Sequence, residues 1–140
     1  MIVQIDTNVV LDVLCAREPF YADSLKIFKL CEVGKIEGHI LSLSIADIVY
    51  ILRKELTADS IKEILDKLFL IFKIDDLKAE DLKSASELHF SDYEDALQTV
   101  CAKRNQASYI VSRNTKDFSQ SSIQAITPAE FIKLIIKFTC

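Results

Sequence analysis

Short apolar runs alternate along the chain with segments whose apolar residues recur every three or four positions. Short runs rich in β-branched residues are typical of buried strands, whereas a period near 3.6 is typical of helices that bury one face. Strands are therefore predicted at residues 1–5, 39–43, 70–74 and 109–112, with a short fifth at 123–126. Helices are predicted from residue 9, at 20–32, 44–55, 57–67, 78–88 and 92–103, and from the capping sequence Thr127-Pro128-Ala129-Glu130.

Strands that alternate with helices predict a parallel sheet covered by helices on both faces. We expect an α/β fold of three layers, α/β/α, whose central, mostly parallel sheet has four to five strands. The 140 residues are enough for one substantial core, and no Pro-, Gly- or Ser-rich linker divides them. The pattern therefore predicts a single domain over residues 1–140.

Composition narrows the class of protein. Half of the residues are hydrophobic, and only two are Gly and two are Pro, which excludes a disordered chain. No apolar run approaches the roughly 20 residues of a membrane span, and the first residues lack a signal-peptide pattern. We therefore expect a cytoplasmic protein with no membrane partner.

The cysteines and the net charge give weaker constraints on the class of protein than the overall composition does. The four cysteines show no C-x-x-C spacing and no clustered histidines, which argues against zinc and predicts free thiols, three of them on apolar helical faces. A formal net charge of −4 does not indicate a nucleic-acid-binding protein. The carboxylates of a metal site would themselves lower the net charge, however, and a local rim of Arg and Lys could still hold phosphates.

Acidic residues recur where the predicted strands end. Asp6 directly follows the first strand, Asp47 and Asp95 lie in the first turns of two helices, and Asp117 follows the 109–112 strand. Asp92 is an additional candidate. Because right-handed crossovers bring the C-terminal ends of parallel strands to one edge of the sheet, these carboxylates can converge.

Three of these acids also have a simpler explanation as helix-capping residues. Ser44-x-x-Asp47, Asp92-x-x-Asp95 and Asn114-x-x-Asp117 each resemble an N-cap followed three residues later by an acid. Such an acid stabilises a helix N-terminus by about 0.3–1 kcal/mol. Asp6 is harder to explain in this way, because a charge directly after a buried strand needs a partner.

Convergence of the acids would require a counter-charge. Two carboxylates about 4 Å apart repel by about 4 kcal/mol at an effective dielectric near 20. A hard divalent cation such as Mg²⁺ offsets this repulsion, since it favours carboxylate oxygen. Such a site activates water and neutralises the charge that builds on a phosphate, so the constellation predicts phosphodiester hydrolysis.

Three stretches of the chain carry recognisable motifs: Ile5-Asp6-Thr7-Asn8-Val9-Val10-Leu11-Asp12, Asp92-Tyr93-Glu94-Asp95-Ala96-Leu97-Gln98 and Ser112-Arg113-Asn114-Thr115-Lys116-Asp117-Phe118. They resemble the D-x-N, D-A and T-R-N-x-x-D-F signatures of the PIN-domain ribonucleases, a family that includes the VapC-like toxins of bacterial toxin–antitoxin pairs. Order, spacing and strand–helix placement extend the resemblance over nearly the whole chain. It implies a PIN-like fold and a Mg²⁺- or Mn²⁺-dependent endoribonuclease that leaves a 5′-phosphate and a 3′-hydroxyl.

The resemblance also implies roles for individual residues. Asp6, Asp95 and Asp117 would bind the metal, and Asp47 would complete the catalytic set. The family usually has a Glu at the place of Asp47, which is one methylene shorter, so we expect Asp47 to hold the metal weakly or through a water. Supporting or substrate-binding roles are expected for Thr7, Asn8, Asp92, Ser112, Arg113, Asn114 and Lys116.

Within that supporting set, Arg113 and Lys116 are the predicted phosphate contacts. For one further aspartate and both histidines of the chain, we favour a structural role. Asp12 is predicted to have a surface or salt-bridge role, and His39 and His89 lack partners at metal-ligand spacing.

The leading hypothesis is therefore the toxin of a type II toxin–antitoxin pair, acting on single-stranded or loop RNA. By analogy with the family it would bind an antitoxin whose tail blocks the acidic cleft, and it could form a homodimer.

Two alternatives remain open at this point. A PIN-fold module that binds RNA or protein without efficient catalysis would account for Asp47. A receiver-like phosphorylation domain also gathers acids at strand ends, with Asp75 or Asp76 as phosphoacceptor. The Lys that a receiver has at a later strand end is missing here, because the 109–112 strand leads into Arg113 and Asn114.

Overall fold

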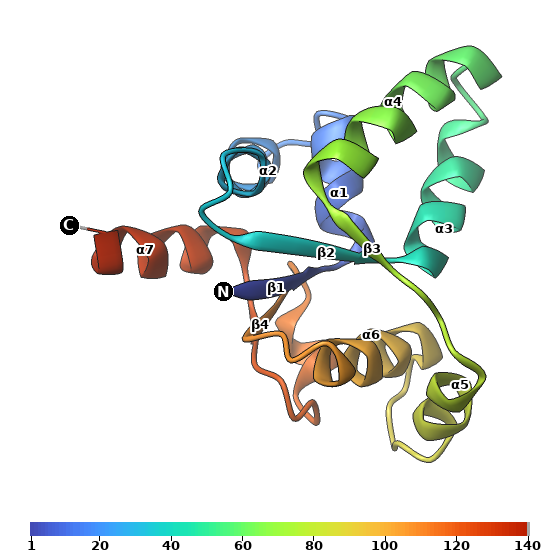
Figure 1. The fold of residues 1–140 in the computed structure, drawn as a ribbon, viewed down its shortest axis with the longest axis vertical. Helices are drawn as coiled ribbons and strands as arrows, with labels where there is room; N and C mark the ends of the chain where they lie inside the picture. Colours follow the sequence, from blue (N-terminus) through green and yellow to red (C-terminus); the bar gives the residue numbers. More distant parts are fainter. Residues whose placement is uncertain (140) are drawn as a thin grey trace.

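The structure, a computed structural model, describes residues 1–139, in which helices cover a five-stranded sheet (Figure 1). The strands are β1 (Ile2–Ile5), β2 (Glu37–Leu41), β3 (Lys73–Asp75), β4 (Tyr109–Val111) and β5 (Ala125–Ile126). The helices are α1 (Thr7–Leu14), α2 (Tyr21–Glu32), α3 (Ser42–Leu52), α4 (Ala58–Ile71), α5 (Ala79–Ser86), α6 (Tyr93–Arg104) and α7 (Pro128–Thr139), with a short 3₁₀ helix, η1 (Thr115–Phe118).

All neighbouring strands are parallel, in the order β3-β2-β1-β4-β5. The first strand is therefore central, with Gln4 aligned with His39 of β2 on one side and with Ile110 of β4 on the other. The order reverses between β1 and β4, and open α/β sheets bind ligands beyond the carboxyl ends of their strands at such a point.

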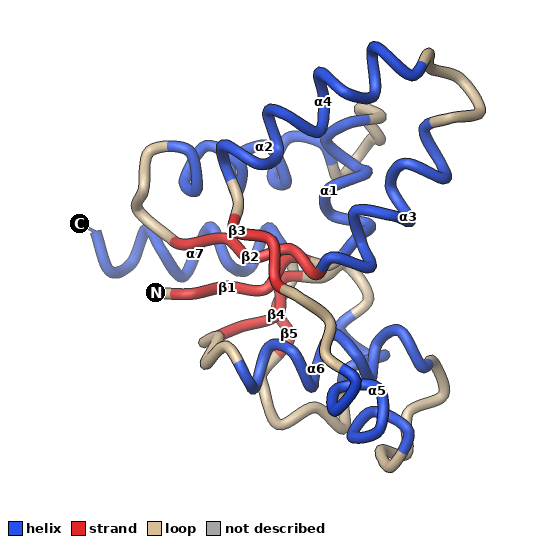
Figure 2. The backbone as a smooth tube through the Cα atoms, turned by 45° about the vertical axis from the view of Figure 1, so that its right-hand side comes forward, coloured by secondary structure: helices blue, strands red, loops and turns tan. Residues whose placement is uncertain are grey.

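The helices form two layers, one on each face of the sheet (Figures 1 and 2). Helices α1, α2, α3, α4 and α7 pack on one face, where Val3 and Ile5 of β1 join the main core. Helices α5 and α6 and the 3₁₀ helix η1 pack on the other, over Leu41 and Ile110. Because side chains alternate across a strand, Gln4 points to the α6 face, where it hydrogen-bonds Gln98. The predicted α/β/α architecture is confirmed.

Several element boundaries differ from the prediction, and two of the differences change the place of a residue in the fold. β2 ends at Leu41 and α3 begins at Ser42, so Ser44 is a buried residue inside the helix and not its N-cap. α4 continues to Ile71, so Leu70, predicted as strand, lies in the helix and is 88% exposed. A short apolar run fits a strand or a helix end equally well, and here the stripe of the preceding helix extends through it.

The glycines at the start of β2 have different roles. Gly34 has a φ of +77°, a left-handed conformation that suits the turn after α2. Gly38 lies in β2, where a Cβ atom would approach Cys31 Sγ at 2.6 Å and Phe72 Cδ1 at 2.7 Å. The absence of a side chain at Gly38 thus lets α2 and the end of α4 pack closely on the strand.

The receiver-like alternative is wrong, because the sheet order differs. In a receiver-type sheet, of order 2-1-3-4-5, the third strand lies beside the first, which places the phosphoacceptor among the other acids. Here β3 is an edge strand and β2 separates it from β1. Asp75 is buried against His39, and Asp76 forms an ion pair with Arg104 at 3.4 Å.

The thiols agree in part with expectation. Cys31 and Cys101 are free and buried, and burial raises the pKa of each to about 12. Cys15 is free but exposed, and Cys140 lies outside the described residues. Among residues 1–139, no helix combines the length and the apolar character that a membrane crossing requires.

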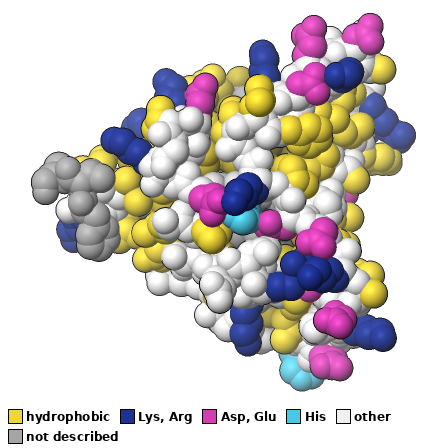
Figure 3. Space-filling view, in the orientation of Figure 1, with side chains coloured by type: hydrophobic (Ala, Val, Ile, Leu, Met, Phe, Trp, Pro, Cys, Tyr) yellow, Lys and Arg dark blue, Asp and Glu magenta, His cyan; other side chains and the backbone are white. Residues whose placement is uncertain are grey.

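Acidic and basic side chains gather in a cluster around His39, where β2 pairs with the edge strand β3 (Figure 3). Its Nδ1 lies 2.8 Å from Asp75 Oδ1, its Nε2 lies 3.4 Å from Glu37 Oε2, and Lys73 pairs with Glu37. The hydrogen bond with Asp75 is the main cause that raises the pKa of His39, and the charges of Asp75 and Glu37 add to it. The structural interpretation of His39 is thus borne out by its contacts.

The raised pKa of His39 should make stability depend on pH. In the unfolded chain a histidine titrates near pH 6.5, so the cluster stabilises the fold fully below about pH 6.5 and loses that contribution as pH rises through the higher folded pKa. We expect His39→Gln to cost more unfolding free energy at about pH 6 than at about pH 8.5, measured by urea denaturation. An equal loss at both pH values would contradict a protonated His39.

Candidate active site

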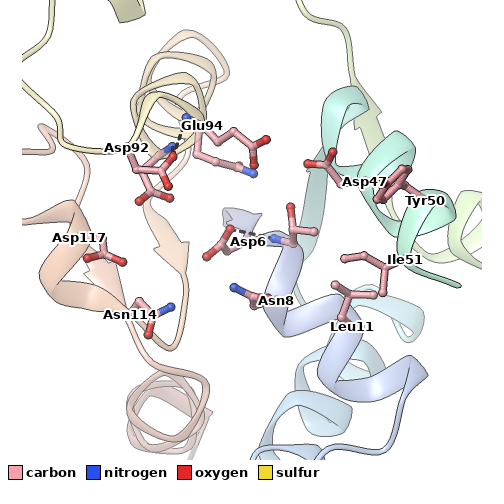
Figure 4. A pocket seen from close by; sticks show the side chains of 13 residues that line it. Asp6, Asn8, Leu11, Asp47, Tyr50, Ile51, Asp92, Glu94, Asn114 and Asp117 are labelled. Atoms are coloured by element: carbon pink, nitrogen blue, oxygen red, sulfur yellow. Dashed lines mark hydrogen bonds between the residues drawn. The ribbon is translucent and has the colours of Figure 1, made fainter. Parts of the chain in front are cut away.

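A cleft with a volume of about 420 Å³ opens at the carboxyl ends of β1 and β4, between α1, α3, α6 and η1. Six acidic side chains from different elements line it, namely Asp6, Asp47, Asp92, Glu94, Asp95 and Asp117. All of them except Asp95 are labelled in Figure 4. Convergence of Asp6, Asp47, Asp95 and Asp117, predicted from their positions at strand ends, is therefore observed. The neutral polar lining consists of Thr7, Asn8, Gln98 and Asn114.

Asp6 is the most constrained of these acids, because it both ends β1 and caps α1. Its Oδ1 accepts a hydrogen bond from the backbone N–H of Thr7, and its Oδ2 accepts one from Ser112 Oγ, each at 2.8 Å. Ser112 Oγ in turn accepts from the backbone N–H of Asn114 at 3.1 Å. Burial raises the pKa of Asp6 although both hydrogen bonds oppose the rise. The hydroxyl of Ser112 thus ties the loop after β4 to the carboxylate at the end of β1.

Asp92 performs the capping role that was considered as an alternative and also lines the cleft. Its side chain accepts from the backbone N–H groups of Glu94 at 2.8 Å and Asp95 at 3.3 Å, which starts α6 at the cleft wall. Asp95 follows in the first turn. Burial, together with the charges of Asp92, Asp6 and Asp117, raises the pKa of Asp95 to about 7. The charges of the neighbouring carboxylates thus add to the effect of burial at Asp95.

Asp47 and Glu94 lie on opposite walls. Because α3 begins at Ser42, Asp47 belongs to its second turn and not to its first, but it still lines the cleft. Glu94 extends from α6 toward Asp47 (Figure 4), and burial and the charge of Asp47 raise the pKa of Glu94. Sequence reasoning missed Glu94. It lies within the Asp92-Tyr93-Glu94-Asp95 motif, but an acid in a first helical turn is explained by the helix dipole alone.

A buried polar network supports the floor of the cleft. Gln4 Nε2 of β1 donates to Gln98 Oε1 of α6 at 2.9 Å, and Gln98 Nε2 donates to Ser44 Oγ of α3 at 3.0 Å. Thr7 Oγ1 of α1 lies 2.7 Å from the same Ser44 oxygen. The network connects α1, α3 and α6, each of which carries cleft residues, to the central strand, so it fixes their relative positions. The hydroxyl of Thr7 belongs to this network.

Arg113 has a partner away from the cleft. Its Nε donates to Asp12 Oδ2 at 2.7 Å, and its guanidinium lies 4.4 Å from the centre of the Phe20 ring. Asp12 is fully buried, so the predicted salt bridge is present but lies in the interior, and Arg17 adds a second contact at 3.7 Å. A phosphate contact by Arg113 would have to compete with this pair. Lys116 is exposed on η1, outside the cleft lining, and its phosphate contact stays a prediction.

The donors in the cleft suit one type of metal ion. All of its charged side chains are carboxylates, and the described lining contains no His or Cys, so it does not resemble a zinc site. Within residues 1–139, no three such side chains lie close enough together to coordinate one ion directly. Mg²⁺ usually keeps several waters and binds through one or two protein carboxylates. The cleft therefore fits a hydrated, hard divalent cation.

Similar proteins share this architecture. The sequence model of the PIN domain matches residues 3–116. Ribonuclease VapC1 of Aquifex aeolicus (strain VF5) is 30% identical over 132 residues, which cover 91% of this chain and 90% of that protein.

Solved structures show a similar fold. VapBC2 from Rickettsia felis, bound to a DNA fragment from its promoter, matches with a TM-score of 0.67 at 19% identity over 91% of this chain and 98% of that chain. A toxin–antitoxin complex from Klebsiella pneumoniae matches with a TM-score of 0.66 at 17% identity over 90% and 97%. Both likenesses concern the fold.

Removing Arg113 should destabilise the fold. Arg113→Ala leaves the buried charge of Asp12 with only the longer contact to Arg17, and an uncompensated buried charge costs about 3 kcal/mol. The change should cost much less in an Asp12→Asn background, where no charge is left unpaired. Urea denaturation of the four proteins measures both effects. Wild-type stability in Arg113→Ala would show that the pair contributes nothing, and would return Arg113 to the predicted phosphate role.

Neutralising Asp95 should stabilise the protein in the absence of metal. Its folded pKa of about 7 lies above the unfolded value of 3.8, so the ionised carboxylate weakens the fold progressively as pH rises from about 4 through 7. Asp95→Asn removes that repulsion, so with EDTA its melting temperature should exceed that of the wild type at about pH 8 but not at about pH 4. Glu63→Gln, which removes an exposed charge on α4, serves as the control. Its melting temperature should differ from that of the wild type by the same amount at both pH values. A lower melting temperature for Asp95→Asn at both pH values would contradict the repulsion.

Proposed function

The chain belongs to the PIN-domain family, and from this premise we propose that it is an endoribonuclease toxin that hydrolyses RNA with Mg²⁺ or Mn²⁺ as cofactor. The observation that carries the proposal is the convergence of six carboxylates from different elements on one cleft, with the pKa of Asp95 raised to about 7. A surface of this kind is unstable without a counter-charge, and purely structural acids would not be gathered in this way.

Three of the acids are assigned to the metal. Asp6, Asp95 and Asp117 would hold it, as the family motifs imply, with some of these contacts made through the waters that Mg²⁺ keeps, because the three are too far apart to coordinate one ion directly. When bound, the cation supplies an activated water and neutralises charge on the phosphate. Ser112 and the Thr7 amide keep the Asp6 carboxylate in one orientation, so it does not have to be reoriented when the cation and substrate arrive.

The remaining cleft residues position the substrate. Asn8 and Asn114 line the same part of the cleft as Asp6 and Asp117 (Figure 4), and their amide groups can donate to phosphate oxygens or to waters. Asp92 holds the first turn of α6, and with it Asp95, in place. The family resemblance implies that water would attack the phosphorus and that the bond to the 3′ oxygen would break, with a proton passing to that oxygen, which would leave a 5′-phosphate and a 3′-hydroxyl.

The alternative of a binding module without catalysis rested on the shorter side chain at Asp47. Glu94 weakens that alternative, because it brings a second carboxylate to the region that Asp47 faces. The cleft therefore does not lack a carboxylate on this side, although Asp47 is shorter than the Glu that the family usually has at its place. We assign Asp47 and Glu94 together to the side of the site that the family usually provides with one Glu.

We further propose a protein partner of the antitoxin class. Support comes from the similar chains, which were solved as a VapBC complex and as a toxin–antitoxin complex. An acidic cleft that binds phosphate through a cation can be blocked by a basic segment of such a partner. The expected site of action of the nuclease is the cytoplasm, where messenger and transfer RNA are available.

Cleavage of a mixed pool of transfer and messenger RNA by the purified protein tests the function. We expect cutting with Mg²⁺ or Mn²⁺, none with EDTA, and a loss of at least about 100-fold in Asp6→Asn, as is typical when a group that stabilises transition-state charge is removed. End-group analysis should find 5′-phosphates.

A second readout is independent of activity. Mn²⁺ should raise the melting temperature of the wild type, because it binds the folded cluster and not the unfolded chain, and the increment should shrink in Asp6→Asn. Metal-dependent stabilisation without cutting would favour the binding module, and Asp47→Glu would then be the next variant. Folded protein that shows neither effect would overturn the proposal.

A further inference from the structure

One wall of the cleft differs from the rest in its chemistry. Leu11, Tyr50 and Ile51 form it, on the side of α1 and α3 (Figure 4). Tyr50 is the one aromatic side chain among the described residues that line the cleft, and 54% of its surface is exposed. A large aromatic ring that lies half in solvent beside a polar cleft is available to a ligand.

Two cations lie against this ring. Arg53 Cζ is 4.1 Å and Lys54 Nζ is 5.7 Å from the centre of the Tyr50 ring. Both cations are exposed, and within residues 1–139 neither lies within ion-pair distance of a carboxylate. Arg113 and Arg104, in contrast, are each paired with a buried aspartate. The charges of Arg53 and Lys54 are therefore available to an anion.

An acidic cleft needs such a wall if its substrate is a polyanion. The carboxylates repel every phosphate except one that a cation neutralises, so the phosphates on either side of the cleavage point need separate cationic contacts. Proteins that hold single-stranded nucleic acid combine cationic side chains with exposed aromatic rings on which bases stack. A guanidinium stacked on a ring keeps its N–H groups directed outward for a phosphate.

We propose that Tyr50 stacks on an unpaired nucleobase beside the cleft, while Arg53 and Lys54 bind a neighbouring phosphate of the same strand. The inference rests on the proposed function, because it takes RNA to be the substrate, and it narrows the substrate class to single strands. Stacking accepts every base, so Tyr50 selects for unpaired bases and not for sequence. A duplex cannot present a free base face, so it should bind weakly.

The position of these residues also has a purely structural explanation. Arg53 and Lys54 follow the last turn of α3, where cations interact favourably with the helix dipole. That explanation accounts for the two charges but not for the exposed ring inside the cleft lining. The two explanations differ in their consequences, because only nucleobase stacking makes RNA affinity depend on whether a base is present at the position beside Tyr50.

The test is equilibrium binding of a labelled single strand of about 12 nucleotides to full-length protein with Mg²⁺. All variants carry Asp95→Asn so that the RNA stays intact, as a gel confirms. Tyr50→Ala should weaken binding about tenfold and Tyr50→Phe less than about twofold. A set of oligonucleotides, each lacking the base at a different position, then locates the stacked nucleotide. For the one that lacks the base bound by Tyr50, Tyr50→Ala should no longer weaken binding. Arg53→Ala and Lys54→Ala should each reduce the slope of log affinity against log salt by about 0.7.

Matched controls lie on α4, outside the cleft. Phe69 is 50% exposed, so Phe69→Ala removes an aromatic ring of similar exposure, and Lys67→Ala removes an exposed charge. Neither should change binding. The chain has four tyrosines and no tryptophan, so quenching of tyrosine fluorescence by RNA in the parent, reduced in Tyr50→Phe, reports stacking directly.

The outcomes separate this inference from the proposed function. Metal-dependent cleavage by the wild type, with RNA affinity unchanged in Tyr50→Ala, would overturn the stacking and leave the nuclease standing. Binding that depends on Tyr50 and on the base, without any cleavage, would support the stacking and overturn the nuclease. Absence of RNA binding in folded protein would overturn both. Equal losses of affinity in Tyr50→Ala and Phe69→Ala would overturn the stacking alone.

Discussion

Repulsion among carboxylates at the carboxyl edge of the sheet is the constraint on which the rest of the site depends. The folded chain holds Asp6, Asp95 and Asp117 near one another, and the charges of Asp6 and Asp117 add to the effect of burial in raising the pKa of Asp95. The burial of apolar residues on both faces of the sheet outweighs this repulsion, which is confined to a few side chains. A site that is destabilising in this way is typical of function, because the energy stored in it becomes available to a bound cation.

Several local contacts keep the acids from relaxing apart. Asp6 is held at both oxygens, by Ser112 and by the Thr7 amide, and Asp92 fixes the first turn of α6. Beneath them, the hydrogen bonds from Gln4 through Gln98 to Ser44 span the sheet and helices on both of its faces. Buried polar side chains of this kind are stable only when hydrogen-bonded, so they define one arrangement of the helices around the cleft.

The proposed roles in binding and in chemistry fall on different walls of the cleft. Carboxylates at the end of β1, around the start of α6 and on η1 provide the side that suits a cation. Tyr50 of α3 (Figure 4), with Arg53 and Lys54 directly after that helix, provides an aromatic and cationic side. The charge of Arg113, in contrast, is used in the interior, where it compensates Asp12 and joins the loop after β4 to α1. The net charge of −4 conceals this division, because it averages over surfaces of opposite character.

Local features of the sequence determined the elements and much of the site. Hydrophobic periodicity, the capping residue Asp92 and the break at Asp6 depend on neighbours within a few positions, so they can be recognised without a structure. Tertiary structure alone decided which polar groups meet across the fold. Ser44 caps no helix but joins a buried network. Asp75 lies away from the site because its strand, β3, is at the edge of the sheet. Glu94 reaches Asp47 from a helix more than forty residues away in the sequence. Periodicity specifies which face of an element is buried, whereas the partner of each side chain depends on strand order and helix crossing, which no local pattern encodes.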